Sequence, residues 1–190
     1  MMVQQVLALN LVPGIERISV LETNRVPATD LRDNPTGCCP RFHPERWDRQ
    51  ALHFQQKPFA RAMSHEVRRV PQDMAPAYAA AASAIERARG WEEQQMLVLN
   101  RLLPGGKAEH LFAVSKSVPG LEMIRLDGDY RTKLFEGPYE QAPHWQAEFE
   151  QDLTDQGLTA QAIYLYFTTC PACSEFYGRN YVVAVAKVSD

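Results

Sequence analysis

Apolar and polar residues alternate with two different periods along this chain of 190 residues. Within 74–85, apolar side chains recur at steps of three and four residues, the period of one helix face, and Gly90 follows where such a helix would end. Trp145, Phe149 and Leu153 show four-residue spacing and predict a second helix. We therefore expect one amphipathic helix in each half of the chain.

The other apolar runs are short, and their residue types favour β-strands. They cover 52–54, 59–67, 96–103, 111–118, 123–135, 163–169 and 180–188. Lys57-Pro58 separates the first two runs, because proline lacks the amide that a sheet requires. The residues 104–107 (Pro-Gly-Gly-Lys) predict a hairpin turn, and 127–129 (Asp-Gly-Asp) predict another turn inside the fifth run.

The predicted elements follow the order strand, helix, hairpin twice, over about 47–118 and 121–190. Two such units pair edge to edge into an antiparallel sheet, with two helices on one face and a groove on the other. A groove between similar halves is a common place for a small ligand. We expect an α+β domain of two similar halves over 47–190, preceded by an N-terminal arm at 1–46.

Composition narrows the class of protein. Hydrophobic residues make up 45% and charged residues 23%, which is typical of a globular protein. The net charge of −3 gives no basic surface for nucleic acid or an anionic membrane, so we expect neither as a partner. The first ten residues carry no Lys or Arg, and the four cysteines fall in two close pairs, which favours a cytoplasmic location.

A seven-residue run between the fifth strand and the second helix carries a family resemblance. It is Leu134-Phe135-Glu136-Gly137-Pro138-Tyr139-Glu140. Its Gly-Pro-Tyr resembles the corresponding element of GyrI-like domains, and the doubled strand, helix, hairpin order matches their fold over about 47–188. The resemblance implies a small-molecule-binding domain, because that family includes drug sensors, gyrase inhibitors and hydrolases of cyclopropane-containing compounds.

Three further segments resemble a branch of bacterial stand-alone GyrI-like proteins labelled hydrolases. They are 38–48 (Cys-Cys-Pro-Arg-Phe-x-Pro-x-x-Trp-Asp), 168–173 (Thr-Thr-Cys-Pro-Ala-Cys) and 177–181 (Tyr-Gly-Arg-Asn-Tyr). Drug-binding members of the family carry a pocket glutamate where this chain has Ala162. The resemblance therefore implies that any pocket carboxylate comes from elsewhere, with Glu136, Glu122 and Glu66 as candidates.

Alternation along the sixth run places Tyr164 and Tyr166 on the face away from the helices, where they would line the groove. We add Tyr139 and Trp145 as ligand-binding candidates, although the helical spacing of Trp145 is more typical of a residue that docks a helix on a sheet. Glu136 is the catalytic candidate, because it ends a strand beside the Gly-Pro turn. The alternative for each is an ordinary structural or solvated residue.

The two cysteine pairs are the remaining chemical feature. Cys38, Cys39, Cys170 and Cys173 supply the four ligands of a zinc site if the arm folds back onto the loop between the last two strands. Adjacent cysteines point apart in an extended chain, so one of them with His43 is an equal alternative. A redox pair, or thiols without a special role, are the other hypotheses.

We expect a protein that binds a small organic molecule between its two halves, with hydrolysis of that molecule as the enzyme hypothesis. One alternative is a binding module that sequesters ligands or contacts a protein partner. The other is a zinc- or redox-dependent thiol protein. The first two hypotheses need no cofactor, and the third needs zinc or a reversible disulfide.

Overall fold

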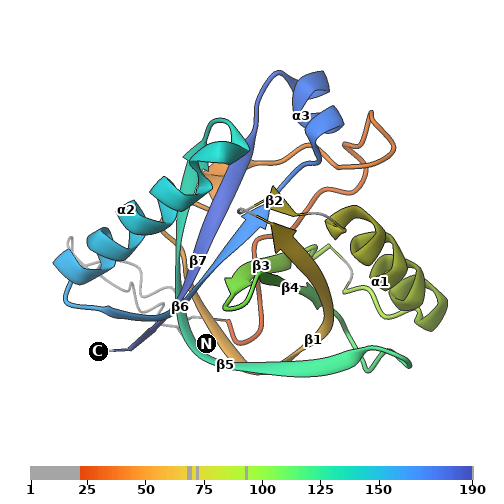
Figure 1. Ribbon diagram of the computed structural model, residues 1–190, viewed down its shortest axis with the longest axis horizontal. Coiled ribbons are helices and arrows are strands. Elements are labelled where there is room, and N and C mark those ends of the chain that lie inside the picture. Colours follow the sequence, from red (N-terminus) through yellow and green to blue (C-terminus); the bar gives the residue numbers. More distant parts are fainter. Residues whose placement is uncertain (1–21, 68–69, 72, 93, 190) are drawn as a thin grey trace, which may run out of the picture.

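The computed structural model describes residues 22–67, 70–71, 73–92 and 94–189, so the first 21 residues of the predicted arm lie outside it. The described residues form an α+β structure (Figure 1). Its strands are β1 (Ala51–Val67), β2 (Val70–Pro71), β3 (Val98–Leu103), β4 (Lys107–Ala113), β5 (Glu122–Glu136), β6 (Thr159–Phe167) and β7 (Tyr181–Ser189). Its α-helices are α1 (Met74–Ala88), α2 (Ala142–Asp155) and α3 (Pro171–Tyr177). No helix in this part of the chain has the length and hydrophobicity needed to cross a membrane.

The antiparallel sheet closes on itself, whereas the sequence led us to expect an open one. The strand order is β2-β1-β4-β3-β6-β7-β5, and β5 also pairs with β1. A bulge between Phe54 and Lys57 curves β1, and Gly128 of β5 faces Phe54 with φ of +102°. The predicted turn at 127–129 is therefore wrong, because Gly128 bends a continuous strand rather than reversing the chain.

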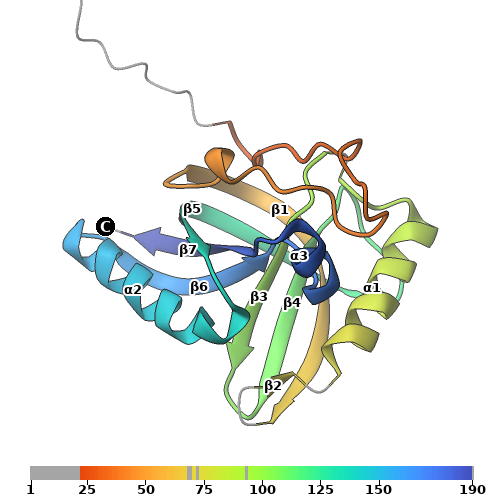
Figure 2. The same cartoon turned by 90° about the horizontal axis from the view of Figure 1, so that it is seen from above.

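Both predicted helices pack on the outer face of this sheet (Figure 2). Helix α1 buries Ala81 and Ile85 against the outer side chains of β1 and β4, while α2 packs on β6 and β7. The alternation predicted for β6 is confirmed, since Leu165 packs beneath α2 and the two tyrosines belong to the inner cluster. The duplicated order of strand, helix and hairpin is thus present, with closure added.

The N-terminal arm covers part of the inner face. Val26 and Trp47 are buried among the inner side chains, and Phe42 packs against them. The ring centroid of Trp47 lies 5.3 Å from that of Tyr166. Farther back along the arm, Lys57 Nζ of β1 donates to the Asn24 carbonyl at 2.9 Å. Aromatic side chains of the arm therefore occupy space where we expected an open groove.

A buried polar network lies where the sheet has its shortest strand pairing. There β3 and β6 share the single register pair Asn100↔Leu165. The Asn100 amide donates to the Leu165 carbonyl at 2.8 Å, so its oxygen faces His110 Nδ1, also at 2.8 Å. Since that oxygen accepts, Nδ1 carries the proton and Nε2 accepts from Ser64 Oγ at 2.8 Å. Tyr78 of α1 donates to the same Asn100 oxygen.

Trp47→Ala tests the docking of the arm on the sheet. Trp47 is 3% exposed, and truncating a buried aromatic residue destabilises a protein by about 3–5 kcal/mol. Phe176→Ala is the matched control, because Phe176 is 63% exposed and its loss should change the unfolding free energy by about 0.5 kcal/mol or less. Urea denaturation compares the two, and equal stability of both variants would contradict the packing described.

His110 predicts a pH dependence of stability. Burial lowers the pKa of His110 to about 4, although Asp73 opposes the shift. An unfolded histidine titrates near pH 6.5, so the unfolded chain binds the extra proton as the pH falls from about 6.5 to 4. The contribution of His110 is complete above pH 6.5, and about 2 kcal/mol of it is lost between pH 7 and pH 5. Urea denaturation of wild type and His110→Gln should show that difference, and parallel pH profiles would refute it.

Candidate metal centre and adjoining cavity

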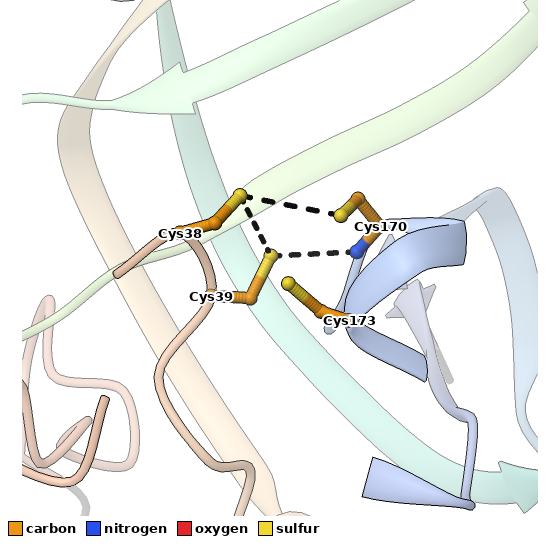
Figure 3. A group of neighbouring side chains, drawn as sticks. All are labelled: Cys38, Cys39, Cys170 and Cys173. Atoms are coloured by element: carbon orange, nitrogen blue, oxygen red, sulfur yellow. Dashed lines mark hydrogen bonds between the residues drawn. The ribbon is translucent and has the colours of Figure 1, made fainter. Parts of the chain in front are cut away.

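The four cysteines of the chain converge on one point (Figure 3). Cys38 and Cys39 come from the arm, while Cys170 and Cys173 come from the start of α3, and all four Sγ atoms lie within 4.8 Å of one another. Cys38 Sγ lies 3.7 Å from Cys39 Sγ and 4.0 Å from Cys170 Sγ. The thiols are free, without a disulfide. The convergence that the zinc hypothesis required is therefore present.

A tight turn explains how adjacent cysteines face the same way. The amides of Cys38 and Cys39 both donate to Thr36 Oγ1, at 3.2 and 3.1 Å. Gly37, which links Thr36 to Cys38, has φ of +66°. This geometry is a hydroxyl-capped turn, and the positive φ suits glycine. Our expectation that the two side chains diverge was wrong, because it assumed an extended chain.

On the opposite side, Cys170 directly precedes α3 and Cys173 lies in its first turn. This helix has seven residues, where we expected only a loop. Pro171 occupies the first turn, where its missing amide leaves no hydrogen bond unmade. The Cys170 amide donates to Cys39 Sγ at 3.4 Å, and the Tyr177 hydroxyl donates to the Cys39 carbonyl at 2.7 Å. The arm and α3 are thus joined by backbone groups as well as by sulfur.

The four thiols have different surroundings, which shift the pKa values of Cys39 and Cys173 in opposite directions. Burial raises the pKa of Cys39 well above its usual value. The hydrogen bond with Thr36, at 3.4 Å, lowers the pKa of Cys173 to about 7. His43 is not part of this cluster, since its Nδ1 lies 3.5 Å from a Glu45 oxygen. Among the described residues, the side chains grouped closely enough to hold a metal ion are the four cysteines. The geometry favours the four-cysteine set over the alternative with His43.

A small cavity lies along the same junction between arm and α3. Its volume is about 190 Å³. It is lined by Arg41, Phe42, Pro44, Thr169, Tyr177, Arg179 and Tyr181. A second, more open depression is lined by the Gly137-Pro138-Tyr139 turn and by residues of α3, among them Ser174 and Glu175. The Gly-Pro-Tyr element and the cysteine segment therefore border neighbouring surfaces.

The predicted catalytic and ligand-binding residues near α3 and α2 lie as follows. The Glu136 side chain is 52% exposed, with one oxygen 3.9 Å from Arg179 Nε. The Tyr139 hydroxyl donates to the Thr169 carbonyl at 2.8 Å. Trp145 is buried and stacks on Phe135 with 5.5 Å between ring centroids. Trp145 therefore docks α2, while the roles of Glu136 and Tyr139 stay predictions.

The two tyrosines of β6 lie on the inner face of the sheet, a few residues before Cys170 in the sequence and close to the arm. Tyr166 contacts Trp47, and the guanidinium of Arg101 lies 5.0 Å from the ring centroid of Tyr164. Ala162 is partly buried and packs against the same inner cluster.

One carboxylate on the inner face, Glu109, was not predicted from the sequence. Glu109 is 4% exposed and shares the face of Leu111, as strand alternation along β4 could have indicated. It lies 3.1 Å from Arg61 Nε and 2.6 Å from a terminal nitrogen of Arg101. Glu122 also pairs with Arg61, at 3.2 Å, and the Glu66 side chain lies outside the described residues. The buried acid is therefore neutralised by two cations.

Comparisons with known proteins agree on family and fold. Residues 29–188 match the model of a family described as bacterial hydrolase. An uncharacterised conserved protein from Listeria innocua has a similar structure, with a TM-score of 0.55 and 9% identity over 75% of this chain and 92% of the other. A protein described as a hydrolase from Listeria innocua gives a TM-score of 0.51 and 12% identity over the same shares, 75% and 92%. These structural similarities concern the fold, and no curated protein sequence matches this chain.

Proposed function

This chain belongs to the bacterial hydrolase family, and we propose that its four cysteines bind one zinc ion that fastens the N-terminal arm to α3. The observation that carries this proposal is the convergence of four Sγ atoms within 4.8 Å from segments far apart in sequence. Four cysteines form one of the standard ligand sets of tetrahedral structural zinc sites.

The spacing of the sulfur atoms supports a single tetrahedral ion. Zinc–sulfur bonds of about 2.3 Å place tetrahedral ligands about 3.8 Å apart. The separations of Cys38 Sγ from Cys39 and Cys170, 3.7 and 4.0 Å, agree with that value. The Cys170 amide donates to the Cys39 sulfur, an outer contact that orients a thiolate ligand.

A set of four thiolates predicts a structural rather than a catalytic role for the ion. Zinc bound by four protein ligands has no open position for water or substrate, so the ion would supply binding energy between the arm and α3. Arg41, Phe42 and Pro44 directly follow the cysteines and line the cavity. Any catalytic chemistry would therefore fall to side chains rather than to the metal.

The second candidate function is hydrolysis of a small organic molecule at that cavity. The family description supports hydrolysis, and Glu136 lies beside Arg179, which lines the cavity. A carboxylate at this point would act as a general base on water or position it. The tyrosines of the inner face and Tyr139 stay ligand-binding candidates within this proposal.

Metal analysis tests the zinc site. Protein purified without a metal-affinity tag should contain about one zinc per chain, and Cys39→Ser and Cys170→Ser should lose it and unfold at lower temperature. His43→Ala is the control and should keep its zinc. Metal-free protein whose thiols react freely would exclude the site, and a disulfide formed on mild oxidation of such protein would favour the redox hypothesis.

Turnover assays test the hydrolase function. A panel of ester and strained-ring compounds should include a substrate whose hydrolysis falls at least tenfold in Glu136→Gln, because the amide cannot take a proton from water. Glu140→Gln, an acid that lines the neighbouring open depression and not the cavity, is the matched control. Unchanged turnover in Glu136→Gln would remove Glu136 from the mechanism, and ligand-induced stabilisation without turnover would favour the binding module.

A further inference from the structure

The cavity between the arm and α3 has a lining that favours one class of ligand. We propose that it binds a small aromatic carboxylate and that the zinc site assembles it, an inference that rests on the proposed metal function. The lining contains two arginines, three aromatic residues and no Asp or Glu.

Two segments far apart in the chain build the lining. Arg41, Phe42 and Pro44 come from the arm, shortly after Cys39, whereas the other four residues lie between Thr169 and Tyr181. The cysteine cluster lies at the start of both segments, since Thr169 directly precedes Cys170. An ion that joins the cysteines therefore holds the two sides of the cavity together, and its loss would separate them.

The aromatic residues offer flat apolar surface. The ring centroids of Phe42 and Tyr181 lie 5.8 Å apart, and those of Phe42 and the inner-face Tyr166 lie 6.3 Å apart. Aromatic ligands pack against such rings in stacked or edge-on arrangements. At about 190 Å³ the cavity is smaller than the roughly 300–1,000 Å³ of drug-sized pockets, which indicates a ligand with one ring.

The arginines offer donors for a carboxylate. Arg179 Nη1 donates to the Tyr181 hydroxyl at 2.9 Å, which anchors the guanidinium at the cavity, while Glu136 at 3.9 Å from Nε lies beyond hydrogen-bond range. Arg41 lies 4.9 Å from the Tyr177 ring centroid, and Asp33 engages its Nε at 3.1 Å. A guanidinium has five N–H donors and binds carboxylates through two parallel hydrogen bonds, so both arginines keep donors for a ligand.

The cavity favours a negatively charged ligand, whereas a pocket built around a glutamate would favour a positively charged one. On the inner face of the sheet, position 162 is an alanine, and the carboxylate of Glu109 is paired with Arg61 and Arg101. Neither position offers a free carboxylate to a cationic ligand. The lining of the cavity, with its two guanidinium groups, instead complements an anion.

Calorimetric titration with benzoate tests the proposal on zinc-loaded full-length protein. Benzoate should bind, while benzamide, which has the same shape without the charge, should bind at least tenfold more weakly. Arg179→Gln should weaken benzoate binding at least tenfold, because a paired charge-assisted hydrogen bond is lost. Arg87→Gln, an arginine of α1 remote from the cavity, is the control.

The outcomes separate this proposal from the zinc site. Zinc present at one per chain with no benzoate binding, or equal binding of benzoate and benzamide, would overturn the ligand class and leave the metal site intact. Full benzoate affinity in metal-free Cys39→Ser would overturn assembly by the metal. Loss of benzoate binding on chelation, with recovery when zinc is restored, would support both parts.

Discussion

The pairing of β1 with β5 is the interaction on which the rest of this structure depends. The two strands pair along 51–54 with 128–131 and, beyond the bulge, along 57–61 with 122–126. This contact closes the sheet. Closure divides the side chains into an inner cluster and two outer ones, each outer cluster beneath its own helix. It also removes the exposed strand edges that an open sheet would present for aggregation.

Closure of the sheet depends on the buried polar network between β3 and β6. With a single register pair there, the backbone contributes little pairing, and the side chain of Asn100 supplies an additional hydrogen bond to the neighbouring strand. Ser64, His110 and Asn100 have the order of a nucleophile, a base and an orienting group, but Ser64 and His110 are each 1% exposed and line neither cavity. Their position indicates a structural network that joins β1, β3, β4, β6 and α1.

Local patterns predicted the helices, the alternation of β6 and the doubled order of elements, because each of these depends on neighbours in sequence. The closed sheet, the covering arm and the turn at Thr36 were not predictable in this way. An alternating strand looks the same in an open or a closed sheet, and the direction of Cys38 and Cys39 depends on one hydroxyl and one glycine. Cysteine spacing suggested a four-ligand site, but only the fold brings residues 131 positions apart together.

That separation has a consequence for the order in which the protein matures. The arm cysteines leave the ribosome long before Cys170 and Cys173, because 131 positions separate Cys39 from Cys170. A metal ion bound across the pair of segments closes a loop of about 131 residues, and fixing a loop of this length removes roughly 5 kcal/mol of unfolded-chain entropy by the model used for disulfides. The cluster is complete only when synthesis has passed α3, so chains that stop early lack two of its ligands. Metal uptake would then mark chains whose synthesis has passed α3.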